Sequence, residues 1–564
     1  MNFDWLALLL LGGGLALSLS AIFRRGDRPR TMLALIGLLV VGGVLRLYHA
    51  SMPSLWLDEF GTYWAVHTVS FSDFLRRVWA SVPQTPAYYA LVYAVTHLFG
   101  YSEATLRAPS VVAGVLSLPA LFWFARSAFG GRTRPALVAA LLLSTTFFHM
   151  ALSLDARPYA LAYLVAIGSA AAWFRLVRTG SWVAGLLFAA AAAATVYVHW
   201  LSGLYVASQV VVGLGLLLWQ RRSRAEILRF VGFAALCGLL LLPALPKLLH
   251  DLAHAPRHDW MRQQSTDALL GTLAEAVFDL VPTGALLYAL VAHAVARIRG
   301  AGATEATARD RFALVALGAL FLAPLGFAAV VYLATGEFFF VPRYLYFLTI
   351  ASLPLAALLI ELLGRRGVRF GITVVAIVPC VLVLQVRSLA LYGTFKDYHA
   401  DDQWRDGLAE LDRTYKPGDL LLFRAGHIDE DYAAATGDPD ANEFVRNPIS
   451  GFYNRKNYTP VVSLTKDWDP QHFQNRMEEV RQAVEQAWRQ DRRVVVAGVD
   501  SIIRGRYYFD HLMDSLQQPD RPPFERVDVK SWGKIKLLVL RPTGRPPATG
   551  QAVSLSPAAP SPPQ

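Results

Sequence analysis

The stretch "SLWLDEFGTYWA" at residues 54–65 follows an apolar run that is long enough to cross a membrane. It places two adjacent acids, Asp58 and Glu59, between Trp56 and Trp64. A carboxylate is costly at membrane depth, whereas tryptophan favours the membrane–water interface. The stretch therefore predicts an acidic site at the membrane–water interface. The topology of the chain decides which side of the membrane this site faces.

The composition is that of a polytopic α-helical membrane protein. Hydrophobic residues make up 54% and charged residues 17% of the 564 residues, and the mean hydropathy is +0.37. A soluble domain carries about a quarter charged residues, so much of this chain avoids water. Apolar windows of about 20 residues, the length that a bilayer requires, recur along residues 1–390. Both cysteines lie inside such windows, so a disulfide framework is not indicated.

The net charge of +11 is spread over short loops between the apolar windows. Arginine in short loops marks the cytoplasmic side of a membrane protein. A nucleic-acid footprint would be a stripe on one soluble domain, so nucleic acid is excluded as the partner. The arginine-containing loops are residues 24–30, 126–134, 175–180, 220–224, 297–300 and 365–369.

These loops fix the topology, because two cytoplasmic loops must be separated by an even number of spans. Between the loops at 24–30 and 126–134, a crossing by residues 86–100 would make the number odd. That segment is also short for a full crossing. We therefore expect it to lie in the interface as a helix, and residues 50–108 to form one large outer loop. About twelve spans result, and Asp58 faces outward.

The chain is expected to contain a transmembrane domain, 1–390, a small extracytoplasmic α/β domain, 391–545, and a disordered tail, 546–564. "KPGDLLLFRAG" is typical of a turn followed by a buried strand, and "VRQAVEQAWRQDRRVVVAGVD" of a helix followed by a strand. "ERVDVKSWGKIKLLVLRP" predicts a closing hairpin around a glycine-containing turn. The tail is rich in Pro, Ala and Ser, a composition that does not form a core.

Asp155 lies in "SLDARPYAL" (153–161), where two spans meet with almost no loop between them. The topology places Asp155 on the same side as Asp58, so the two carboxylates are expected to converge on one cavity. There they could hold a divalent cation, or one could act as general base while the other orients a donor. The alternative is structural: Asp155 pairs with Arg157 and caps the helix that begins at Pro158.

Several further candidates lie on the same side of the membrane. Arg343 and Tyr344 stand where "FFFVPRYLYF" (338–347) enters a span, either to grip a phosphate or to anchor the helix at the interface. Arg107 and His199 are additional candidates for contacts to a lipid-linked phosphate. Glu59 is either a second base or the acceptor of a backbone hydrogen bond.

The ordered run of "DE" at 58–59, "PAYY" at 86–89, "LFGYSE" at 98–103 and "LRAPS" at 106–110 resembles the GT-C membrane glycosyltransferases. The nearest branch is the group of dolichyl-phosphate-mannose protein mannosyltransferases and lipid A aminoarabinose transferases, and the likeness covers roughly residues 50–165. It implies a sugar donor on a polyprenyl phosphate, an essential acid at Asp58, and a nearby acid at Asp155 that shares any bound metal.

One departure from the aminoarabinose branch concerns the donor phosphate. That branch has a Lys-Pro pair near the start of the interfacial helix, where this chain has "QTPAYY". Arg343, Arg157 or a metal would have to supply the positive charge instead.

The sequence thus predicts an inverting hexosyl- or pentosyltransferase that uses a polyprenyl-phosphate sugar. Its acceptor is a hydroxyl group on a glycan, a lipid or a protein, and it acts at the outer face of a bacterial inner membrane. A transporter or flippase of lipid-linked sugars, with the acids as ion sites, is the alternative, and a non-catalytic assembly subunit is a third reading.

Overall fold

The computed structural model divides the chain into two compact units. The first comprises Met1–Pro53 and Gly61–Lys396, and the second comprises Ser54–Phe60 and Asp397–Gln564. Residues 368–390, the last part of the expected transmembrane domain, and the expected tail at 546–564 lie outside the described residues. The structure describes residues 10, 12–14, 16–20, 28–49, 54–81, 85–254, 280–298, 306–335, 342–363, 403–425, 446–449, 451–453, 458–464, 470–500, 502–503, 506–516 and 523–544.

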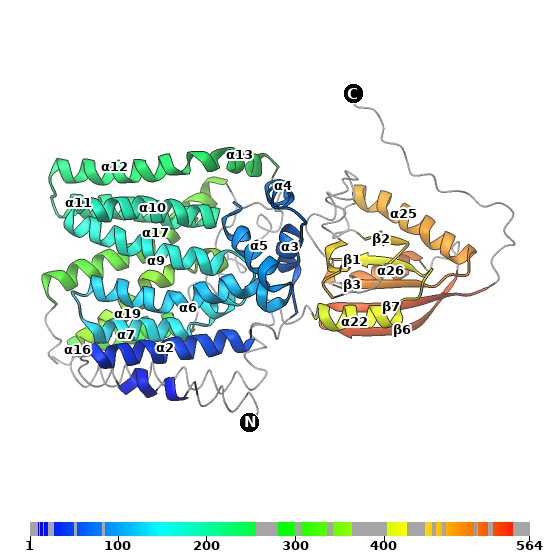
Figure 1. Ribbon diagram of the computed structural model, residues 1–564, viewed down its shortest axis with the longest axis horizontal. Helices are drawn as coiled ribbons and strands as arrows, with labels where there is room; N and C mark the ends of the chain where they lie inside the picture. Colours follow the sequence, from blue (N-terminus) through cyan, green and yellow to red (C-terminus); the bar gives the residue numbers. More distant parts are fainter. Residues whose placement is uncertain are drawn as a thin grey trace. The chain divides into compact units, whose positions relative to one another are not determined.

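The first unit is a bundle of apolar helices (Figure 1). Among the described residues, six helices are long and apolar enough to cross a membrane. The helices of this unit are α2 (Arg28–His49), α3 (Leu57–Val66), α4 (Phe71–Ser81), α5 (Ala87–Phe99), α6 (Glu103–Ala128), α7 (Thr133–Thr145), α8 (Phe147–Ser153), α9 (Tyr159–Thr179), α10 (Trp182–Val198), α11 (Gly203–Trp219), α12 (Arg224–Leu241), α13 (Leu245–His254), α16 (Leu280–Ile298), α17 (Ala308–Thr335), α18 (Pro342–Leu345) and α19 (Leu348–Leu362), with the first turn of α3 assigned to the second unit.

Helix α9 is the centre of the bundle, because it packs along both α6 and α10. Small residues line its buried side, among them Ala162, Ala166 and Ala170, each fully buried. In a membrane, small side chains allow helix backbones to approach closely, which strengthens van der Waals packing. The packing of α9 thus fixes the position of the turn that precedes it.

The apolar window at residues 135–153 is broken into α7 and α8 at Thr146, which adopts an extended conformation. The hydroxyl groups of Ser144, Thr145 and Thr146 donate to carbonyl groups of the preceding helical turn. Such back-bonding competes with the helical ladder and bends helices. Because the helix is interrupted at Thr146, α8 does not have to continue the axis of α7 before it leads into the turn at residues 154–158.

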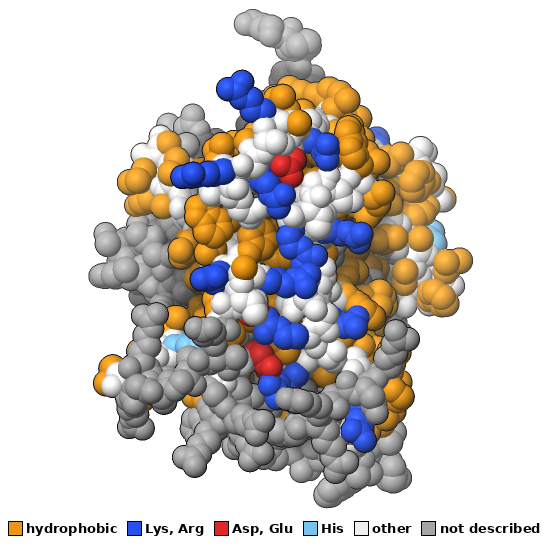
Figure 2. All heavy atoms as spheres, turned by 90° about the vertical axis from the view of Figure 1, so that its left-hand side faces the viewer, with side chains coloured by type: hydrophobic (Ala, Val, Ile, Leu, Met, Phe, Trp, Pro, Cys, Tyr) orange, Lys and Arg blue, Asp and Glu red, His pale blue; other side chains and the backbone are white. Residues whose placement is uncertain are grey.

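Arginines concentrate at one end of the helical unit. Figure 2 looks onto the helix ends at the left of Figure 1 and shows Lys and Arg side chains gathered there. Two of them are held by acids: Arg134 Nη2 lies 2.5 Å from Glu361 Oε1, and Arg132 pairs with Asp310. This distribution is the one that short cytoplasmic loops produce.

The second unit is built on a five-stranded mixed sheet with strand order β2-β1-β3-β7-β6. The parallel strands are β2 (Val461–Ser463), β1 (Leu420–Arg424) and β3 (Val494–Val499), and the antiparallel hairpin is β6 (Phe524–Trp532) with β7 (Ile535–Pro542). Helices α22 (Trp404–Thr414), α25 (Pro470–Arg489) and α26 (Tyr508–Leu516) complete it. The predicted buried strand and closing hairpin are both present.

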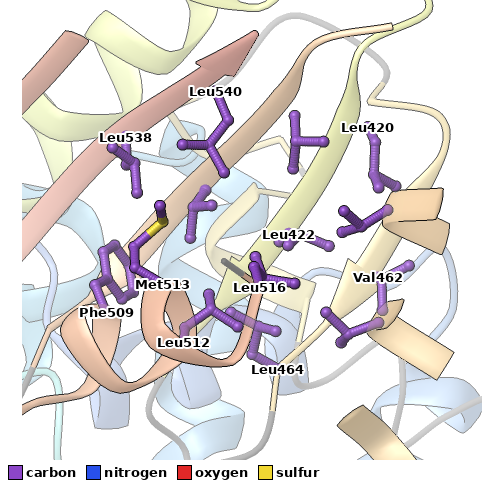
Figure 3. Close-up of a cluster of buried hydrophobic side chains, with 14 of the residues drawn as sticks. Leu420, Leu422, Val462, Leu464, Phe509, Leu512, Met513, Leu516, Leu538 and Leu540 are labelled. Atoms are coloured by element: carbon purple, nitrogen blue, oxygen red, sulfur yellow. The ribbon is translucent and has the colours of Figure 1, made fainter. Parts of the chain in front are cut away.

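Leucine and valine side chains from β1, β3 and β7 form the core of this sheet together with residues of α25 and α26 (Figure 3). All five residues of β1 are buried, as expected for a strand covered on both faces. Residues 54–60 also belong to this unit: the Phe60 ring lies 5.8 Å from the Trp404 ring, and the Tyr453 hydroxyl accepts from Leu55 N at 2.7 Å.

Candidate active site

The turn at residues 154–158, between α8 and α9, carries the second acid singled out in the sequence. Asp155 is 5% exposed. Pro158 occupies the N-cap position of α9, and no side chain caps this helix end. Asp155 therefore does not act as the helix cap. Its buried carboxylate stays a functional candidate beside the alternative of an ion pair with Arg157.

Side-chain hydroxyls from two other helices hold this turn in place. Thr62 Oγ1 on α3 donates to the Ala156 carbonyl at 2.9 Å. Ser110 Oγ on α6 donates to the Arg157 carbonyl at 2.9 Å and lies 2.8 Å from the Tyr88 hydroxyl of α5. Because Ser110 uses its only proton on the carbonyl, Tyr88 is the donor in that second bond. The two residues that directly follow Asp155 are thus held in place from α3 and α6.

The first pair of acids lies in the opening turn of α3. The Glu59 carboxylate is fully buried and accepts a bond of 3.4 Å from Trp56 N, as in one half of a capping box. Asp58 is half-buried and precedes Thr62 by one helical turn. Of the two roles open to Glu59, the structure contains the backbone hydrogen bond. Asp58 belongs to the second compact unit and Asp155 to the first, so their convergence stays a prediction.

Two arginines and a histidine that the sequence singled out come together in the helical unit. His199 ends α10 and is 1% exposed. Burial, together with the positive charges of Arg157 and Arg343, lowers the pKa of His199 to about 3. The imidazole is therefore neutral, and both guanidinium groups lie within electrostatic reach of it.

Arg107 and Tyr344 complete the set of predicted phosphate contacts. Arg107 is 2% exposed and lies three residues before Ser110, so both side chains share one face of α6. Its position relative to Ser110 places Arg107 on the side of α6 that holds the Asp155 turn. Tyr344 is part of α18, but its side chain lies outside the described residues.

Three tyrosines, Tyr159, Tyr163 and Tyr346, pack beside His199 and form an aromatic wall. The Tyr159 ring lies 5.1 Å from the His199 ring, and the Tyr346 hydroxyl donates to the Tyr159 carbonyl. Tyr163 stacks on Tyr346 with ring centroids 5.3 Å apart. Burial raises the pKa of Tyr346 well above its usual range, so this hydroxyl stays protonated and remains a donor.

The sequence analysis missed a buried basic pair next to this wall. Arg46 of α2 is fully buried, and its Nη2 donates to His149 Nδ1 of α8 at 2.8 Å. Its Nη1 donates to the carbonyl of Gly42 at 3.1 Å. The His149 ring in turn lies 4.7 Å from the Tyr163 ring. The available signal was an arginine and a histidine inside otherwise apolar windows, since ionisable residues at membrane depth indicate function by default.

The types of side chain present indicate which metal ion the predicted site could hold. Among the described residues there is no group of three or more His, Cys, Asp or Glu side chains that could hold a metal ion. Zinc sites need such a set, whereas Mg²⁺ is often bound by one or two carboxylates together with water and substrate phosphates. If a cation is held by Asp58 and Asp155, their chemistry suits a hard cation rather than zinc.

Comparisons with known proteins show which family model the sequence matches and which solved structures have a similar fold. Residues 83–250 match the family model for dolichyl-phosphate-mannose-protein mannosyltransferase. The fold is similar to ArnT from Cupriavidus metallidurans bound to undecaprenyl phosphate, with a TM-score of 0.50 and 14% identity over 89% of this chain and 97% of that chain. The apo state of the same ArnT gives a TM-score of 0.51, with the same identity and coverage. A search of curated protein sequences gives no match.

The fold, a bundle of apolar helices with a small sheet domain at the C-terminal end, is similar to that of the membrane protein ArnT. The match of residues 83–250 to the mannosyltransferase family model agrees with the resemblance drawn from the motif run in residues 50–165.

Proposed function

We propose that the protein transfers a sugar from a polyprenyl-phosphate donor to a hydroxyl acceptor in a single inverting displacement. The bond between the sugar C1 and the phosphate oxygen breaks, and the electron pair leaves with the polyprenyl phosphate. A bond forms between the acceptor oxygen and C1, and the acceptor proton passes to a carboxylate. The site must therefore stabilise negative charge on a phosphate and accept one proton.

One observation carries the assignment of the donor phosphate: Arg157 and Arg343 both act on the buried His199. Both guanidinium groups are partly buried and lie close to the same imidazole, so together they create a local positive charge that favours an anion. A phosphate is such an anion, and the planar fork of arginine matches phosphate oxygens. His199 stays neutral and adds a hydrogen-bonding group without adding charge.

The acid–base part of the proposal falls to Asp58 and Asp155. Asp155 is buried in a turn held by Thr62 and Ser110, so its carboxylate has a fixed position. Asp58 lies on the same helix as Thr62, one turn earlier. We assign the proton transfer to Asp58 and the orientation of the donor, directly or through a divalent cation, to Asp155.

Two observations support the choice of lipid carrier and the side of the membrane on which the site lies. ArnT has been solved with undecaprenyl phosphate, which favours a polyprenyl phosphate as the lipid carrier here as well. The arginine-bearing helix ends in Figure 2 favour a cytoplasmic position for that end of the bundle. The turn at 154–158 would then be extracytoplasmic. The topology read from the sequence puts the C-terminal domain on the same side of a bacterial inner membrane.

The test is transfer by the full chain in liposomes, with a radiolabelled polyprenyl-phosphate sugar and membrane glycans as acceptor. Asp155→Asn should lower turnover about a hundredfold or more, the usual range for a group in proton transfer or donor orientation. Asp491→Asn is the matched control, because Asp491 is exposed in a turn with a φ of 54° that asparagine tolerates. Translocation of the lipid-linked sugar without any transfer would contradict the proposal and favour a flippase.

A further inference from the structure

A pocket of about 360 Å³ opens between the end of α3, the start of α4 and the end of α5. A volume of this size is sufficient for a small ligand or a head group. None of the candidate active-site residues is among the described residues that line it. The lining residues are His67, Thr68, Val69, Asp73, Arg76, Arg77, His97 and Tyr101.

The two arginines give the pocket its positive charge. Arg77 is oriented by Trp64, since its Nη1 donates to the Trp64 carbonyl at 2.9 Å and its guanidinium lies 4.6 Å over the ring. Arg76 Nε lies 4.0 Å from Asp73 Oδ1, and these side chains are 54% and 51% exposed. So exposed a pair contributes little, and an incoming anion can compete with Asp73 for Arg76.

His97 is held in the wall of the pocket by carbonyl groups of two segments. Its Nδ1 lies 2.8 Å from the Tyr93 carbonyl and its Nε2 lies 3.2 Å from the Thr68 carbonyl. These contacts tie the end of α5 to the segment that joins α3 and α4, and so fix the shape of the pocket.

The surface beside the pocket is apolar. On α4, Phe71, Leu75 and Trp79 follow at intervals of four residues and are 51%, 41% and 46% exposed. At the end of α5, Leu98 and Phe99 are 76% and 74% exposed. An exposed apolar stripe beside basic residues is typical of a helix that lies in the membrane interface.

We propose that this pocket binds the phosphate of an anionic lipid head group, with the acyl chains against the apolar stripe of α4. Arg76 and Arg77 would bind the phosphate oxygens, and the lipid phosphate would replace Asp73 as the partner of Arg76. The proposal does not depend on the transferase reaction, because it concerns a different set of residues.

The test is lipid retention by the purified full chain, measured by mass spectrometry after exchange into mixed phosphatidylglycerol and phosphatidylcholine nanodiscs. Arg76→Gln should lower retained phosphatidylglycerol several-fold, and Asp73→Asn should raise it, with phosphatidylcholine unchanged. Arg224→Gln, an equal charge change at an exposed helix start, is the control and should behave as the unmodified chain. Opposite effects of two neighbouring variants cannot result from a shared loss of folding.

Equal phosphatidylglycerol retention by Arg76→Gln and the unmodified chain would overturn the proposal. A second arm separates the lipid from its soluble head group. Leu75→Ser should weaken retention of the lipid but leave any binding of sn-glycerol 1-phosphate unchanged, because it removes only an acyl-chain contact. Complete displacement of the lipid by soluble sn-glycerol 1-phosphate would also overturn the proposal, since the pocket would then recognise the phosphate alone.

Discussion

Thr62→Val isolates the link between helix α3 and the turn that carries Asp155. Valine keeps the shape of threonine but has no hydroxyl, so the bond of 2.9 Å to the Ala156 carbonyl is lost. Ala156 is fully buried, and leaving a buried carbonyl without its donor costs about 1–3 kcal/mol. If that loss falls on the transition state, kcat falls by about 5- to 150-fold, since 1.4 kcal/mol is tenfold.

The assay is single-turnover transfer in liposomes with saturating donor, together with the thermal unfolding temperature of each variant. Thr96→Val is the matched control: Thr96 is 1% exposed, and its hydroxyl bonds to the Val92 and Tyr93 carbonyls of its own helix and to Tyr101, none of which belongs to the turn that carries Asp155. It should keep near-normal turnover. Thr62→Ser keeps a hydroxyl and should recover most of the activity. Normal turnover in Thr62→Val, or an equal loss in Thr96→Val, would refute the reasoning.

Three further predictions concern the phosphate site and the second unit. Arg343→Gln should raise the donor KM and lower kcat/KM by about 10- to 150-fold, as expected for a lost charged hydrogen bond of 1.5–3 kcal/mol, with Arg343→Lys in between; steady-state kinetics checks this. Gly498→Ala should destabilise the second unit far more than Gly418→Ala in hydrogen exchange, because both glycines have positive φ, but only at Gly498 would the new Cβ lie 1.9 Å from a carbonyl of β1. The hydrogen bond between Glu410 and Lys530 lowers the pKa of the carboxyl and raises that of the amine. Its stabilisation should therefore be lost as pH falls below the ordinary carboxyl range and as pH rises above about 10.5, and Lys530→Gln should flatten both limbs of a plot of unfolding temperature against pH.

Local patterns in the sequence were sufficient for most of the apolar helices, for strands β1 and β3 and for the closing hairpin, but not for strand β2. Strand β1 follows a turn and consists of apolar residues, so its burial can be read from residues 420–424 alone. Asp155 stood out because an acid between two apolar windows is rare. Each of these features depends only on residues that are close to one another in the sequence.

The break at Thr146 and the pair of Arg46 with His149 could not be predicted in the same way. Arg46 and His149 are 103 positions apart, and only the packing of α2 against α8 brings them together. The packing of Phe60 on Trp404 is likewise a contact between distant segments. A hydrophobic window indicates that a residue is in the membrane, but not which residue it meets there.

The central claim is that Asp58 and Asp155 act in one catalytic centre, and a double-mutant cycle tests it most directly. Transfer rates of Asp58→Asn, Asp155→Asn and the double variant would be compared with that of the unmodified chain in the same liposomes. Groups that act as a unit are strongly non-additive, so we expect the double variant to be hardly slower than the slower single one. Losses that multiply, or normal turnover in either single variant, would contradict the account.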